Sequence, residues 1–150
     1  MPDTMSHAPA AVTLLGPSDG EMLNVLGAPM LVKTDARCAP IFLADHTVPP
    51  GYGVPPHTHD VEDEAFYMLE GEIVVESPAG TVTARAGDTA LLPRGVQHSF
   101  RNESGAPARF LVICVDGTRA APMFRALDRL AEPTPQTVMA TCAAHGVRFG

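Results

Sequence analysis

Cysteine is scarce in this chain of 150 residues, and tryptophan is absent. The three cysteines, Cys38, Cys114 and Cys142, are odd in number, lie far apart and form no CxxC pair. This spacing indicates neither a disulfide framework nor a zinc ribbon. Cys114 lies in the apolar run RFLVICV, where we expect a small core residue rather than a nucleophile.

Positive charge is also in short supply. Lys and Arg number 10 against 17 Asp and Glu, and the net charge is −7. This balance disfavours nucleic acid and anionic membranes as partners, because both are polyanions. No stretch approaches the roughly 20 apolar residues of a membrane span. The opening residues, MPDTMSHAPA, lack the basic start and apolar run of a secretory signal, so we expect a cytoplasmic protein.

Proline and glycine are plentiful, with 15 and 13 copies, and they divide the chain into short segments. A chain of this length is most naturally one domain. The strand-like segments are MLVKT, APIFLADHTV, EAFYMLE, EIVVES, GTVTARA, TALLP, QHSFRN and ARFLVICV. Short strands separated by turn signals at such regular spacing predict an all-β sandwich or barrel.

The pattern changes after Thr118. Met123, Phe124, Leu127 and Leu130 recur at helical intervals, and Pro133 ends the pattern. A second short helix is expected in PQTVMATCAAHG. These helices either pack on the barrel or on a partner subunit, or form a lid over a pocket. The N-terminal segment SDGEMLNVLGAPMLV predicts a turn followed by an edge strand, which needs cover, so a homodimer is expected.

Three histidines form the candidate site. His57 and His59 flank one residue, so on a strand their side chains point to the same face. His98, in GVQHSF, begins another strand that a closed sheet would bring beside them. Imidazole is the commonest protein ligand for transition metals, and a carboxylate commonly completes such a set. The alternative for an HxH pair beside a proline turn is a pair of solvated polar residues.

The spacing around these histidines is specific. Residues 51–71, GYGVPPHTHDVEDEAFYMLEG, match the pattern G(x5)HxH(x4)E(x6)G, and residues 87–102 match G(x5)PxG(x2)H(x3)N. These two patterns resemble the paired motifs of the cupin superfamily. The resemblance is close over residues 51–102 and looser over 29–115. It implies a single jelly-roll barrel at 29–116, preceded by an arm and edge strand at 1–28 and followed by a helical extension at 117–150.

The resemblance also implies one divalent metal bound by His57, His59, Glu64 and His98. Asp63 fits a shorter variant of the motif, but strand alternation places Glu64 on one face with Phe66 and Met68, as a ligand inside a barrel requires. The other acids of this stretch, Asp60, Glu62 and Asp63, are expected to form a solvated turn. Asn102 is expected to be a structural hydrogen-bonding residue.

Alternation also predicts an apolar cavity with the metal at one end. The residues expected to line it are Phe66, Met68 and Phe100, with Phe42, His46, Leu92 and Ile113 as further candidates. His46 is either a partner of the metal ligands or a surface residue. His7 and His145 are expected at the surface.

Such a donor set leaves one or two coordination positions open, and it suits Fe, Mn, Ni, Co, Cu or Zn. The chain further resembles small bacterial cupins related to quercetin 2,3-dioxygenase. That resemblance implies a dioxygenase that acts with dioxygen on an enolisable or flavonol-like small molecule, with Glu64 as general base. The alternatives are a metal-dependent isomerase, decarboxylase or lyase of a small oxo-acid, and a non-catalytic ligand-binding module.

Overall fold

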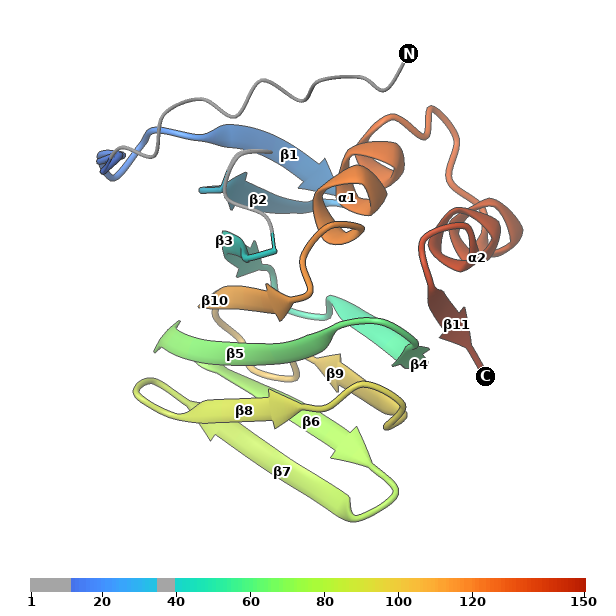
Figure 1. Cartoon of the computed structure of the whole chain (residues 1–150). Helices are drawn as coiled ribbons and strands as arrows, with labels where there is room; N and C mark the ends of the chain where they lie inside the picture. Colours follow the sequence, from blue (N-terminus) through green and yellow to red (C-terminus); the bar gives the residue numbers. More distant parts are fainter. Residues whose placement is uncertain (1–11, 35–39) are drawn as a thin grey trace.

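The computed structural model describes residues 12–34 and 40–150, so His7 and Cys38 lie outside the described residues. The described chain folds into two antiparallel β-sheets with two short helices beside them (Figure 1). The six-stranded sheet contains, in spatial order, β1 (Glu21–Val25), β2 (Ala28–Val32), β3 (Phe42–Val48), β10 (Ala108–Val115), β5 (Asp63–Glu70) and β8 (Thr89–Leu92). The five-stranded sheet contains β11 (Val147–Phe149), β4 (Gly53–His59), β9 (His98–Arg101), β6 (Glu72–Ser77) and β7 (Gly80–Arg85).

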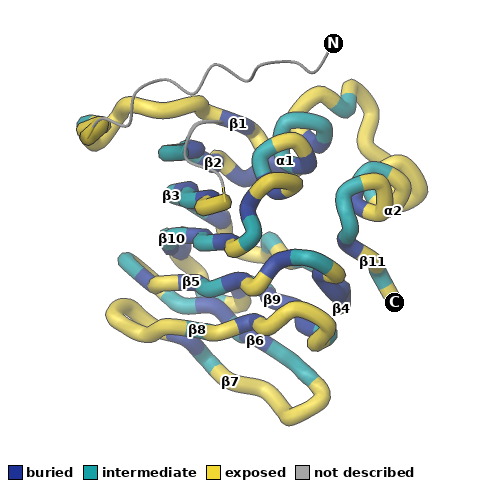
Figure 2. Tube along the Cα trace, in the orientation of Figure 1, coloured by how far each residue is buried: buried dark blue, intermediate teal, exposed yellow. Residues whose placement is uncertain are grey.

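The expected all-β jelly roll is confirmed, and each of the eight strand-like runs contains a strand. Side chains alternate in and out along these strands, as the pleat requires. In β3 the buried positions are Phe42, Ala44, His46 and Val48, and the residues between them are less buried. Figure 2 shows the same alternation along several strands of both sheets. The core therefore lies between the two sheets. β1 ends the six-stranded sheet, and the expected homodimer stays a prediction.

Strand β4 was not among the predicted strand-like segments. It includes the sequence VPPHTH, which contains two prolines and leads to the histidines. Pro55 and Pro56 have no N–H to give to a β-ladder, which is why a strand was not predicted there. β4 tolerates them because its pairing with β9 is irregular between Val54 and His57, and β11 pairs only with residues His57 to His59. The prolines thus occupy the part of β4 where a regular ladder is interrupted.

The C-terminal extension contains the two expected helices, α1 (Ala120–Asp128) and α2 (Pro135–Ala143). Thr134 caps α2 by accepting a hydrogen bond from the backbone N–H of Thr137 at 3.1 Å. α1 packs beside β1, and the ring of Phe124 in α1 stacks on Phe42 of β3 with centroids 5.5 Å apart. The extension then adds β11 to the five-stranded sheet, which the sequence did not predict. Among the described residues, no helix has the length and hydrophobicity needed to cross a membrane.

Gly71, between β5 and β6, shows why the motif needs a glycine. Its φ is +71°, a conformation that side chains with a Cβ rarely adopt. A Cβ there would also lie 2.7 Å from the carbonyl oxygen of Pro107 and 2.9 Å from the Cα of Ala108. The corner that turns β5 into β6 therefore has room for glycine alone.

Candidate metal centre

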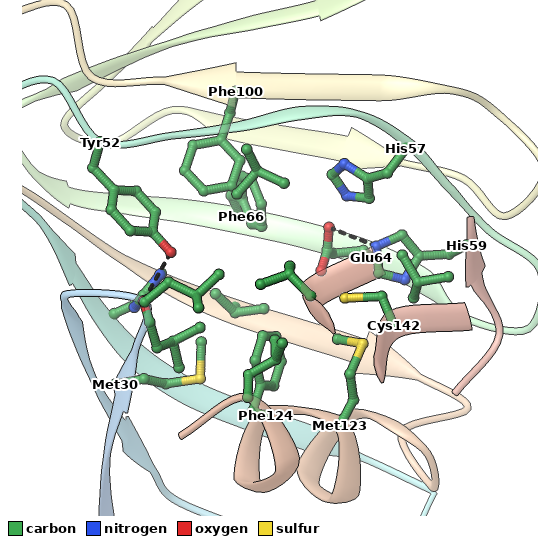
Figure 3. Close-up of a pocket in the computed structure, with 18 of the residues that line it drawn as sticks. Met30, Tyr52, His57, His59, Glu64, Phe66, Phe100, Met123, Phe124 and Cys142 are labelled. Carbon is green, nitrogen blue, oxygen red and sulfur yellow. Dashed lines mark hydrogen bonds and ion pairs between the residues drawn. The ribbon is translucent and has the colours of Figure 1, made fainter. Parts of the chain in front are cut away.

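The four residues implied as ligands meet between the two sheets. His57 and His59 come from β4, Glu64 from β5 and His98 from β9. His57 and His98 are directly opposite each other in the β4–β9 pair. Each of the four residues offers a ligand atom, these atoms all lie within 4.8 Å of one another, and all four residues are buried. Figure 3 shows His57, His59 and Glu64 pointing toward one another at one end of a pocket.

The three imidazoles are held with the same nitrogen facing inward. The Nδ1 of His57 lies 2.9 Å from the carbonyl oxygen of Pro55, and the Nδ1 of His98 lies 3.1 Å from that of Val96. A carbonyl oxygen only accepts, so Nδ1 carries the proton in both rings and Nε2 keeps its lone pair. In His59, Nδ1 contacts a carboxylate instead, which has the same effect. This is the arrangement in which histidines ligate metals through Nε2.

The donor atoms fit a bound cation. The Nε2 of His98 is buried, lies 3.4 Å from Glu64 Oε1, and has no hydrogen-bond partner among the described residues. The Nε2 of His59 lies 3.7 Å from the same oxygen. Two ring nitrogens thus converge on an anionic oxygen, an arrangement that needs positive charge, from a bound cation or from protons on the rings. A divalent metal would satisfy all of these atoms at once.

Glu62 contacts one of the candidate ligands, which the sequence interpretation did not predict. It was expected in a solvated turn, but its side chain is 2% exposed and its Oε2 lies 3.2 Å from His59 Nδ1. Strand parity could have found it, because residues two apart share a face and Glu62 precedes Glu64 by two. The acidic run was interpreted as a turn instead. For Asp60 and Asp63 the expectation is confirmed, since both pair with arginines at the exposed surface, Arg148 and Arg94 respectively.

Burial and neighbouring charges set the protonation of the cluster. Burial, and next the nearby His98, lower the pKa of His57 to about 4, so this ring is neutral near pH 7. Burial raises the pKa of Glu64, but the adjacent ring of His98 and then that of His59 lower it by more. Glu64 therefore stays ionised. Its Oε2 accepts a hydrogen bond from the Cys114 thiol at 3.6 Å, and burial raises the pKa of that thiol, so it remains protonated.

Three of the candidate ligands, His57, His59 and Glu64, line an apolar cavity. Three of the residues predicted to line it do so, namely Phe66, Phe100 and His46. Asn102 is confirmed as structural, because its amide donates to the carbonyl oxygens of Val48 and Ala106.

The other predicted lining residues lie elsewhere. Met68 is fully buried in the core, one step farther along β5 than Phe66. Phe42 is covered by α1, and Leu92 lines a separate hollow beside His98. Ile113 was placed on the wrong face, because the buried positions of β10 are its even-numbered residues, and Val112 lines the cavity instead.

Much of the cavity wall comes from residues outside the predicted lining. The residues that the sequence interpretation did not place there include Met30 and Tyr52 on one side and Met123, Phe124 and Cys142 of the helices on another (Figure 3). β11 adds Val147 and Phe149, and the Phe149 ring lies 5.7 Å from that of His57. Contacts between segments so distant in sequence leave no periodic signal. The C-terminal helices therefore cover the pocket as well as packing on the barrel.

Comparison with known proteins agrees with this geometry. Residues 44–114 match the family model described as "Cupin domain". An oxalate-binding protein of Thermotoga maritima is 34% identical over 68 residues, which cover 45% of this chain and 56% of that protein. The tetracenomycin polyketide synthase protein TcmJ of Streptomyces glaucescens is 28% identical over 94 residues, covering 63% of this chain and 62% of TcmJ. The chain thus spans less than two thirds of either relative.

Solved structures show the same likeness. The crystal structure of a predicted oxalate decarboxylase from Thermotoga maritima superposes with a TM-score of 0.56 and 28% sequence identity. The superposition covers 63% of this chain and 90% of that one. The family match over residues 44–114 spans β4, β5 and β9, the strands that carry the four candidate ligands.

Proposed function

This chain belongs to the cupin superfamily, and from that premise we propose that it is a metal-dependent dioxygenase acting on an enolisable or flavonol-like small molecule. The observation that carries the proposal is a buried set of three imidazoles and one carboxylate that opens into an apolar cavity. Such cavities, with a few polar groups at defined positions, are typical of small-molecule sites.

The residues that would hold the metal are His57, His59, Glu64 and His98. A divalent transition metal there would supply Lewis-acid and redox chemistry, with one or two coordination positions left for ligands from solution. The donor set accepts Fe, Mn, Ni, Co, Cu or Zn.

Glu64 is the group suited to take a proton from the substrate. It is the only carboxylate among the described residues that line the cavity, and its pKa is shifted downward, so it is ionised and able to accept. An enol substrate would lose the proton of its hydroxyl to a Glu64 oxygen, and the substrate would remain as the enolate. Phe66 and Phe100 line the cavity beside Glu64 and would hold a planar body while excluding water.

The lining argues against small dianions as substrates. No Lys or Arg occurs among the described residues that form the cavity wall. A dicarboxylate buried there would add two negative charges to an apolar site that already holds Glu64, more than a divalent metal alone would neutralise, and among the described residues no lysine or arginine lines the wall. By this argument oxalate, which the names of two similar proteins mention, is a poor candidate substrate for this chain. A mostly uncharged substrate with one metal-binding oxygen group fits better.

The test begins with metal. Protein purified without chelators, then reconstituted with each candidate metal, should bind one equivalent per chain by elemental analysis. His98→Ala should abolish this binding, and His145→Ala, which changes a histidine outside the cluster, should leave it intact. Substoichiometric metal in the reconstituted wild-type protein would overturn the proposal.

The reaction is tested with the loaded protein. Oxygen uptake in the presence of flavonols or β-diketones, lost in Glu64→Ala, is the expected result. Turnover of an enolisable substrate under strict anaerobiosis would show instead an isomerase, decarboxylase or lyase. Stoichiometric metal with no turnover of any such compound would indicate a ligand-binding module.

A further inference from the structure

His46 occupies a position where the fold calls for an apolar residue. It lies on the inner face of β3, where the other three inward residues are Phe42, Ala44 and Val48, and it is 3% exposed. A leucine or phenylalanine would fill such a position without removing a polar ring from water. The ring lines the cavity that contains Glu64, although it is not one of the four candidate ligands. The metal centre therefore does not explain why a histidine stands there.

The hydrogen bonding of His46 defines its free atom. Nδ1 lies 3.0 Å from the carbonyl oxygen of Pro29, which can only accept, so Nδ1 carries the proton. Burial lowers the pKa of His46, and the ring is neutral. Nε2 therefore has a lone pair. This Nε2 has no hydrogen-bond partner among the described residues. Because it is not one of their fully buried unpartnered atoms and His46 lines the cavity, Nε2 is open to the cavity.

The ring is also fixed in orientation. His46 packs edge-to-face against Tyr52, with centroids 6.0 Å apart, and against Phe110, at 5.5 Å. The hydroxyl of Tyr52 already donates to the carbonyl oxygen of Val25 at 3.0 Å. At this end of the cavity, the described residues thus offer one uncommitted side-chain nitrogen that accepts hydrogen bonds, on a ring that cannot easily turn away.

This acceptor lies away from the metal centre. His46 pairs with Met30 across β2 and β3 and packs on Tyr52. Figure 3 shows Met30 and Tyr52 on the side of the pocket opposite His57, His59 and Glu64. The wall between the two ends is apolar and includes Phe66, Phe100, Phe110 and Val112. The cavity therefore has a metal-binding end, an apolar middle and a hydrogen-bond acceptor at the far end.

We propose that His46 is a specificity-determining residue whose Nε2 accepts a hydrogen bond from a hydroxyl at the end of the substrate remote from its metal-binding oxygens. The proposal rests on the proposed function, because it takes the same cavity as the substrate site. It narrows the substrate class to compounds with a chelating enol, an apolar and preferably aromatic body, and a distal hydroxyl.

A matched set of ligands tests this role. The probes are benzoylacetone, its 4-hydroxyphenyl analogue and its 4-methoxyphenyl analogue, which differ only at the position remote from the diketone. Binding to metal-loaded protein is measured by calorimetry without oxygen, so that turnover does not interfere. The wild-type protein should bind the hydroxyl analogue about 10-fold more tightly than benzoylacetone, as expected for one well-placed hydrogen bond. The methoxy analogue, which has no donor, should show no such gain.

The variants separate recognition from packing. His46→Leu and His46→Phe remove the acceptor and should abolish the preference, so that each variant binds the hydroxyl analogue and benzoylacetone with equal affinity. His46→Gln keeps an acceptor oxygen and should retain part of the preference. Metal content and thermal unfolding show whether each variant is folded. Two apolar variants are used so that the test can still be made if one of them does not fold.

Each outcome has a defined meaning. A hydroxyl preference that persists in both apolar variants would overturn the role of His46, as would wild-type protein that binds both diketones without preference. In these two cases the proposed function stands. If none of the diketones binds the metal-loaded wild-type protein, the proposed substrate class is wrong, and the inference about His46 falls with it.

Discussion

His59 and Glu62 form a buried pair, with the Nδ1 of His59 3.2 Å from Oε2 of Glu62 and side chains that are 6% and 2% exposed. The contact fixes which nitrogen of His59 carries the proton and turns Nε2 toward Glu64. A carboxylate in this position also makes the imidazole a stronger donor to a metal. Glu62 thus belongs to the candidate centre although it offers no ligand atom to it.

We expect Glu62→Ala to weaken metal binding by about 10- to 100-fold, the usual cost of losing such a partner. Competition with a chelator of known affinity at fixed pH measures the change. Asp63→Ala is the matched control, because it removes the adjacent carboxylate, which pairs with Arg94 at the surface. Equal affinities in the two variants would show that Glu62 does not act on the metal.

The metal-free protein should be most stable near pH 6.5. Burial, and next the nearby His98, lower the folded-state pKa of His57 to about 4. Between this pKa and the ordinary value of about 6.5, the His57 ring is protonated in the unfolded chain but not in the folded chain. The free energy of unfolding should therefore fall by up to about 3 kcal/mol from pH 6.5 to 4. Burial of His46 acts in the same direction.

His59 has the opposite effect on the alkaline side. Burial alone would lower its pKa, but the hydrogen bond to Glu62 and the charge of Glu64 raise it above its ordinary value. The stability from this pair is complete below pH 6.5 and is lost as the pH rises through the raised pKa. Denaturant unfolding at a series of pH values measures the loss of stability below and above pH 6.5. Glu62→Gln should reduce the loss above pH 6.5, and Asp63→Asn should leave it unchanged.

Asn102→Ala should lower the free energy of unfolding by about 2–4 kcal/mol, because it removes a buried hydrogen bond to Val48 and the part-buried hydrogen bonds to Ala106 and Ser104. The Asn102 side chain is 1% exposed, donates to two carbonyl oxygens and accepts from the backbone and hydroxyl of Ser104. Asn24→Ala is the control, since Asn24 accepts one hydrogen bond, from Gly27, in an exposed turn. Urea unfolding compares them. A loss no greater than in the control would contradict the assignment.

Two glycine substitutions should differ in cost. Gly87 has a φ of +91° but nothing within 4 Å of an added Cβ, so Gly87→Ala should cost about 1 kcal/mol of backbone strain. Gly71→Ala adds a clash with the backbone of Pro107 and should cost at least about 3 kcal/mol. Thermal or urea unfolding distinguishes the two. Similar losses would mean that the β5–β6 corner can yield to a methyl group.

Most of the strands could be predicted because they follow local rules, and local rules also support three of the ligands that the cupin resemblance implied. A period of two places His57 and His59 on one face, and the same parity selects Glu64 over Asp63. The structure agrees, since Glu64 is buried and Asp63 is paired with Arg94 at the surface. His98 needed the second motif as well, because no local pattern says which distant strand lies beside β4.

The remaining features depend on contacts that leave no local signal. β11 is three residues long and pairs with a strand far away in sequence, so neither its length nor its pattern is distinctive. The helix side chains in the cavity, such as Met123 and Cys142, have the spacing of ordinary packing residues. The prediction for Ile113 was wrong for a different reason. It assigned the odd-numbered residues of β10 to the inner face, and a shift of one residue along a strand moves every side chain to the opposite face.

The short strand β11 has a further consequence, for behaviour in concentrated solution. Without it, β4 would be the outer strand of the five-stranded sheet, and its free backbone groups beside His57 and His59 would be available to a strand of another molecule. β11 occupies those groups, and Pro55 and Pro56 present no N–H along the adjoining stretch. A variant in which β11 cannot dock would therefore tend to aggregate through this edge, and would do so through the strand that carries two of the metal ligands.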